Sequence, residues 1–93
     1  MPHISIVIPV YNEEGILHAA VVDLRERLSP LHWDYEVILA ENGSKDRTVA
    51  IAQELSHKYP EVRMLSVGEP NYGKAMKLGI LESRGDFVIC EEI

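Results

Sequence analysis

Residues 4–10 read Ile-Ser-Ile-Val-Ile-Pro-Val, and this nearly unbroken apolar, β-branched stretch decides the fold class. Strands of that composition are buried on both faces, as in parallel sheets that are covered by helices. Similar apolar runs follow at 35–40, 62–67 and 87–90, of which the run at 62–67 is the weakest. We therefore expect these four runs to be the strands of a single sheet.

The segments between these runs show apolar side chains at the 3.6-residue spacing of amphipathic helices. Asn12 is expected to cap the first helix, Ser44 or Asp46 the second, and Asn71 to open the third. Gly85 is expected to close the third helix as the residue after its C-cap. The alternation βαβαβαβ implies right-handed crossovers, and so a three-layer α/β fold with a parallel, doubly wound, Rossmann-like sheet that ends after the fourth strand.

Length and charge exclude several classes of protein. The chain has 93 residues, which predicts one domain at most, and 9 Lys and Arg against 15 Asp and Glu give a net charge of −6. This balance argues against a nucleic-acid partner and against a polybasic membrane segment. No apolar stretch approaches the roughly 20 residues of a spanning helix, so we expect no membrane segment in this chain. We therefore expect a cytoplasmic protein, whose full-length form could still contact a membrane peripherally.

The only cysteine is Cys90, which cannot form an internal disulfide. Because it lies inside an apolar run, we expect a buried, inert thiol. The four histidines show no ligand spacing and are expected at the surface. The cysteine and histidine content therefore points to no metal site.

Open parallel sheets bind ligands beyond the carboxyl ends of their strands, where strand order reverses. The segments at those ends hold most of the unusual polar residues, which are Tyr11, Glu13, Glu41, Asn42, Asp46, Asn71, Lys74, Glu91 and Glu92. A ring of acids with one lysine suits a divalent cation and a diphosphate, because the cation bridges carboxylate and phosphate oxygens. Helix N-termini at the same edge would add N–H donors for phosphate.

Four motifs, in this order over nearly the whole chain, resemble those of family 2 glycosyltransferases with the GT-A fold. Residues 5–14 resemble the family's first strand and turn, and residues 41–48 resemble Asp-Asp-Gly-Ser-x-Asp-x-Thr. Residues 71–80 resemble the Asn-x-Gly-Lys helix, and residues 83–89 resemble the strand that leads into the Asp-x-Asp metal motif. The resemblance implies that residues 1–93 are the N-terminal, nucleotide-binding portion of an incomplete GT-A domain.

The resemblance also implies a nucleotide pocket. The residues that it places around the base, the ribose or the diphosphate are Pro9, Tyr11, Glu13, Glu41, Asn42 and Lys74. Here Glu41-Asn42 replaces the family's Asp-Asp pair, and the amide of Asn42 can donate as well as accept a hydrogen bond. The choice between uracil and guanine therefore stays open.

A divalent metal, Mg²⁺ or Mn²⁺, is implied as well, because the family uses it to neutralise the nucleotide-diphosphate leaving group. Counting from Gly85 places Glu92 at the first acid of the metal motif. A general base that deprotonates the acceptor is expected beyond Ile93. The implied function is transfer of a sugar from a UDP- or GDP-linked donor to a polyprenyl phosphate, lipid or polysaccharide, with the isolated chain inactive.

Two other functions stay open at this point. One is a non-catalytic nucleotide-binding module of the same fold, and the other is a receiver- or flavodoxin-like signalling domain that holds Mg²⁺ on acids at its strand ends. A fourth strand and helix faces without cover also predict self-association of the chain.

Overall fold

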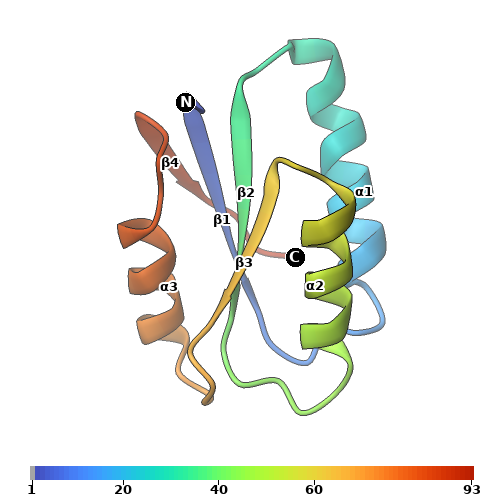
Figure 1. Ribbon diagram of the computed structural model, residues 1–93, viewed down its shortest axis with the longest axis vertical. Helices are drawn as coiled ribbons and strands as arrows, with labels where there is room; N and C mark the ends of the chain where they lie inside the picture. The colour runs from blue at the N-terminus through green and yellow to red at the C-terminus, as the bar shows by residue number, and fades with distance from the viewer. Residues whose placement is uncertain (1) are drawn as a thin grey trace.

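The computed structural model describes residues 2–93 and shows a parallel sheet between two layers of helices (Figure 1). The elements, in chain order, are β1 (Ile4–Val10), α1 (Leu17–Leu28), a short 3-10 helix (Ser29–Leu31), β2 (Tyr35–Glu41), α2 (Thr48–Lys58), β3 (Val62–Ser66), α3 (Tyr72–Leu81) and β4 (Phe87–Cys90). The predicted α/β class and the predicted alternation of strands and helices are confirmed. None of the helices within residues 2–93 is long and apolar enough to cross a membrane.

The strands lie in the order β3-β2-β1-β4, and every neighbouring pair is parallel. The chain runs from β1 through β2 to β3 in one direction, and then returns to place β4 on the free side of β1. Strand order therefore reverses between β1 and β4, which is where doubly wound sheets bind ligands. Flavodoxin-like sheets begin 2-1-3, so this order excludes the receiver- or flavodoxin-like alternative.

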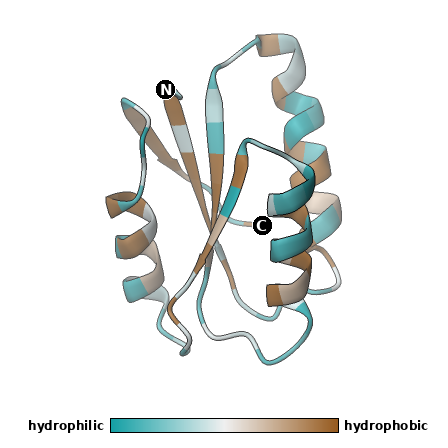
Figure 2. Ribbon diagram, in the orientation of Figure 1, coloured by the Kyte–Doolittle hydropathy of each residue, from teal (hydrophilic) through white to brown (hydrophobic). Residues whose placement is uncertain are grey.

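Helices α1 and α2 cover one face of the sheet, and α3 covers the other (Figure 1). The larger core lies under α1 and α2, where alternate side chains of β1 and β2 meet leucines and valines of the helices. The smaller core lies under α3 and consists of Val7, Ile38, Ala40 and Ala75. Because β1 and β2 are covered on both faces, they are hydrophobic along most of their length (Figure 2).

The expectation that Cys90 is buried is wrong. The residue is exposed, as is the rest of β4. Within residues 2–93, β4 is an edge strand of the sheet, and no helix covers it as α1 and α2 cover β1 and β2. An apolar run thus identified the strand correctly but not its position at the edge of the sheet.

The predicted role of Gly85 is also wrong, because α3 already ends at Leu81. A Cβ at residue 85 would lie 2.7 Å from the backbone nitrogen of Ser5. Glycine is therefore needed for the close approach of the α3–β4 connection to β1. The backbone N–H of Gly85 donates to Ser5 Oγ at 2.8 Å, which fixes this approach.

Candidate functional site

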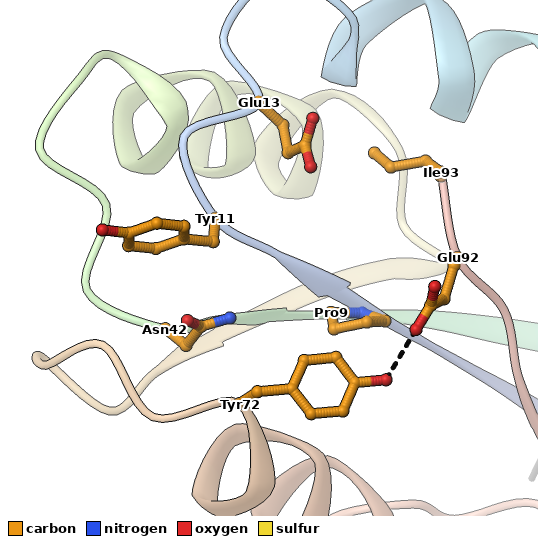
Figure 3. Close-up of a pocket in the computed structure, with 7 residues that line it drawn as sticks. All are labelled: Pro9, Tyr11, Glu13, Asn42, Tyr72, Glu92 and Ile93. Carbon is orange, nitrogen blue, oxygen red and sulfur yellow. Dashed lines mark hydrogen bonds between the residues drawn. The ribbon is translucent and has the colours of Figure 1, made fainter.

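A pocket of about 140 Å³ lies at the carboxyl ends of the strands, at the point where strand order reverses (Figure 3). Its walls consist of Pro9, Tyr11, Glu13, Asn42, Tyr72, Glu92 and Ile93. Complete ligand sites usually occupy about 300–1,000 Å³, so this space suits one part of a larger ligand. The structure thus brings together most of the predicted site residues, from segments that follow three different strands.

The loops after β1 and β2 are tied to each other by hydrogen bonds. Asn12 N donates to Ser44 Oγ at 2.9 Å, and Lys45 N donates to Asn12 Oδ1 at 2.8 Å. Glu13 N donates to Thr48 Oγ1 at 2.7 Å. Asn12 and Ser44 therefore join two loops, and the prediction that they cap helices is wrong.

The N-cap residue of α2 is Arg47 and not Asp46, but the side chain of Asp46 does hold the start of this helix. Its Oδ1 accepts from Thr48 N at 2.9 Å and from Thr48 Oγ1 at 2.5 Å, and its Oδ2 accepts from Glu14 N at 3.3 Å. Desolvation opposes the charged form, but these bonds outweigh it and hold the pKa of Asp46 below its ordinary value. The carboxylate is thus fixed by the loops and stays ionised at neutral pH.

Glu41 is 1% exposed and lies beneath the loops, outside the pocket wall. It accepts hydrogen bonds from Ser66 Oγ at 2.6 Å and from Ser44 N. Burial by itself raises the pKa of Glu41, but the hydrogen bonds from Ser66 and Ser44 outweigh burial and lower it. The structure therefore places Glu41 as a support that joins β2, β3 and the following loop.

Asn42 lies in the pocket with a fixed orientation. Both its Nδ2 at 3.2 Å and its backbone N at 3.0 Å donate to the carbonyl oxygen of Val10. A carbonyl can only accept, so Nδ2 must face Val10, and Oδ1 is left on the other side as an acceptor. Figure 3 shows Oδ1 turned toward the side of the pocket that holds Tyr11. The amide thus presents Oδ1 to the pocket as an acceptor, while Nδ2 uses one of its two hydrogens on Val10 O.

Tyr72 and Ile93 line the pocket although the sequence did not single them out. Tyr72 is the first residue of α3, and its hydroxyl donates to Glu92 Oε1 at 2.7 Å. This hydrogen bond is the main cause that raises the pKa of Tyr72. Tyr72 occupies the variable position of the Asn-x-Gly-Lys motif, so only its place at a helix start beside the strand ends could have indicated it.

Asn71 is the predicted start of α3, and this is confirmed, because its side chain accepts from Lys74 N at 3.0 Å. The side chain of Lys74 is exposed and lies outside the pocket wall. Its Nζ is 3.3 Å from a carboxylate oxygen of Glu69. The lysine therefore stands near the pocket at the first turn of α3, and its role toward a diphosphate stays a prediction.

The carboxylates at the pocket do not make a metal site on their own. Within residues 2–93, no group of three or more His, Cys, Asp or Glu side chains is placed to hold a metal ion. Glu13 and Glu92 both line the pocket, and Glu92 already accepts from Tyr72. The role of Glu92 as a metal ligand stays a prediction.

Strand order and a pocket at the switch point define a Rossmann-like α/β domain. The crystal structure of S. aureus TarS 1–349 has a TM-score of 0.75 at 20% identity, covering 97% of this chain and 27% of that chain. A crystal structure of a mycobacterial protein has a TM-score of 0.72 at 26% identity, covering 98% of this chain and 30% of that chain. The first likeness is one of fold alone.

The chain belongs to glycosyltransferase family 2, since the sequence model "Glycosyl transferase family 2" matches residues 5–90. It is 37% identical to the probable glycosyltransferase YdaM of Bacillus subtilis over 100 residues, 97% of this chain and 22% of that protein. It is 34% identical to the dolichyl-phosphate beta-glucosyltransferase of Homo sapiens over 98 residues, 96% of this chain and 30% of that protein. The undecaprenyl-phosphate 4-deoxy-4-formamido-L-arabinose transferase of Pseudomonas fluorescens is 33% identical over 88 residues, 92% of this chain and 26% of that protein. The predicted family is confirmed, and the chain spans roughly a quarter of the length of these relatives.

Proposed function

We propose that the pocket binds the nucleoside part of a nucleotide-diphosphate sugar, and that the whole protein transfers this sugar to a polyprenyl phosphate. The observation that carries the proposal is the pocket itself, where an aromatic ring, an amide acceptor and two carboxylates meet at the switch point. Relatives named for transfer to dolichyl phosphate and undecaprenyl phosphate support the choice of acceptor.

Each side chain has a distinct task in this proposal. Tyr11 offers a ring on which a base can stack, which is favourable for any base. Oδ1 of Asn42 accepts from a ring N–H, a group that uracil and guanine both carry at neutral pH. Glu13 accepts from the ribose hydroxyls, because a carboxylate can only accept. We assign the diphosphate to Lys74 and the N-terminus of α3, because both lie beside Tyr72 of the pocket wall and supply a positive charge and N–H donors.

The acceptor at Asn42 favours a base with a ring N–H, but it does not separate uracil from guanine. Adenine and cytosine carry an unprotonated ring nitrogen at that edge, so they could donate to Oδ1 only from the neighbouring exocyclic amino group. In this proposal residues 2–93 bind the sugar donor and carry out no step of the sugar transfer itself.

Isothermal titration of the chain with UDP, GDP, ADP and CDP tests this proposal. We expect UDP or GDP to bind at least about tenfold more tightly than ADP and CDP, which corresponds to about 1.4 kcal/mol. Tyr11→Ala should weaken binding by a similar factor through lost stacking. The matched control is Trp33→Ala, an exposed aromatic that lies outside the pocket wall. A folded chain that binds none of the four nucleotides would refute the proposal.

A further inference from the structure

Tyr72 lines the pocket and has no task in the proposed function. Its side chain is 52% exposed, while that of Tyr11 is 39% exposed, so both rings are available to a ligand. In Figure 3 the two tyrosine rings lie on opposite sides of Asn42 and Pro9. A ligand that reaches Asn42 therefore enters between two aromatic side chains.

Local bonds fix the place of Tyr72. The Asn71 side chain caps α3 by accepting from Lys74 N, which holds the first turn of the helix around Tyr72. The hydroxyl of Tyr72 has one hydrogen to donate, and Glu92 Oε1 accepts it at 2.7 Å. The hydroxyl is thus committed at the rim, and the group that remains to face the pocket is the ring.

We infer that Tyr72 is a second aromatic contact of the nucleoside, so that Tyr11 and Tyr72 hold it from two sides while Asn42 reads its edge. This inference rests on the proposed function. Because every base has an aromatic face, the ring of Tyr72 adds affinity without regard to the base. Any preference for uracil or guanine over adenine and cytosine should come from Asn42. The hydroxyl of Tyr72 should contribute less to affinity than its ring.

The test compares Tyr72→Ala, Tyr72→Phe and Tyr11→Ala by isothermal titration of the chain with UDP and GDP. Tyr72→Ala should weaken both nucleotides by about 5- to 150-fold, the range for loss of one stacked aromatic, and should leave the UDP-to-GDP ratio unchanged. Tyr72→Phe keeps the ring and loses only an exposed hydrogen bond, so we expect a change of less than about threefold. The matched control is Ile80→Ala, an exposed apolar residue of α3 outside the pocket wall.

The outcomes separate this inference from the function on which it rests. If Tyr11→Ala loses affinity and Tyr72→Ala does not, the inference is overturned and the proposed function stands. If Tyr72→Phe loses as much as Tyr72→Ala, the bond to Glu92 and not the ring is what counts, which also overturns it. If the folded wild-type chain binds neither nucleotide, the proposed function falls and the inference falls with it. Circular dichroism of each variant shows that a loss of affinity is not a loss of fold.

Discussion

Glu41 offers the sharpest test of how the loops around the pocket are supported. We predict that Glu41→Ala destabilises the chain strongly although Glu41 lies outside the pocket wall. The carboxylate is 1% exposed and accepts from Ser66 Oγ and Ser44 N, two bonds that tie β2 to β3 and to the next loop. Removing it leaves both donors without their partner and opens a cavity beneath the loop.

The magnitude follows from these two bonds. A hydrogen bond to a charged group contributes about 1.5–3 kcal/mol, which gives roughly 3–6 kcal/mol for the pair. Ser66 is exposed and can turn its hydroxyl to water, so the loss should lie near the lower end, at about 3 kcal/mol. A chain of this size has a total stability of about 5–14 kcal/mol, so the variant would lose a large share of it.

Urea unfolding, followed by circular dichroism, measures the effect. With an m-value near 2 kcal/mol per molar urea, about 3 kcal/mol moves the midpoint by roughly 1.5 M. Glu41→Gln should lose less, because its amide oxygen can still accept from Ser44 N while its NH₂ group donates to Ser66 Oγ. Glu54→Ala, at an exposed position of α2, is the control and should stay within about 0.5 kcal/mol of wild type. Equal midpoints for Glu41→Ala and Glu54→Ala would show that the buried carboxylate supports nothing.

Three further predictions concern the same loops and the opposite end of the sheet. Gly43 has φ +82°, and a Cβ there would lie 2.3 Å from the backbone carbonyl carbon of Glu69. Gly43→Ala should therefore lower the free energy of unfolding in urea by at least about 1–3 kcal/mol, and an unchanged midpoint would contradict this. Asn42→Asp removes the N–H that donates to Val10 O and places a carboxylate beside that carbonyl. The free energy of unfolding should therefore fall by about 1–3 kcal/mol at pH 7, and a variant as stable as wild type or more stable would contradict this. Burial raises the pKa of Glu36, but hydrogen bonds from Ser5, Arg84 and Arg63 outweigh it and leave the native pKa below the ordinary 4.5. Its contribution should therefore be complete above about pH 4.5 and be lost as pH falls through the native value, and stability curves of wild type and Glu36→Gln that stay parallel from pH 7 to 3 would count against it.

The sequence predicted the strands well because each strand carries its own signal. An apolar run of β-branched residues marks a strand that is buried on both faces, and the start of β1 at Ile4 and of β4 at Phe87 agrees with these runs. The order of the motifs also predicted the family. Both signals are local, so neither depends on knowing which distant residues meet.

The predictions that failed depend on contacts between distant parts of the chain. Asn12 has the chemistry of a helix cap, yet α1 begins only at Leu17, because Asn12 pairs with the loop that contains Ser44 and Lys45. The exposure of Cys90 follows from its place in an edge strand, and a run of apolar letters does not reveal which strand lies at the edge. Only the folded chain shows these partners.

The candidate site was predictable where motif and geometry coincide, and less so elsewhere. Pro9, Tyr11 and Asn42 were predicted to line a nucleotide pocket, and the structure places all three in one pocket wall. Glu41 was also predicted to line the pocket, but its side chain lies outside the pocket wall. Neighbouring side chains at the end of a strand point to opposite sides, so Glu41 and Asn42 cannot both face the pocket. Tyr72 had no motif to mark it, since its position in the family pattern is variable.

The place of β1 has a consequence for how the protein is made. β1 is synthesised before both of its partners. β2 follows it soon after, but the other partner is β4, whose Phe87 N donates to His3 O. While β4 is still being synthesised, one edge of the central strand has no partner and can pair with another nascent chain. The pocket wall at Glu92 and Ile93 is also completed only when β4 has docked. In the function proposed above, nucleotide present during synthesis should therefore act only after β4 has docked, by stabilising the four-stranded sheet rather than by guiding the earlier strands together.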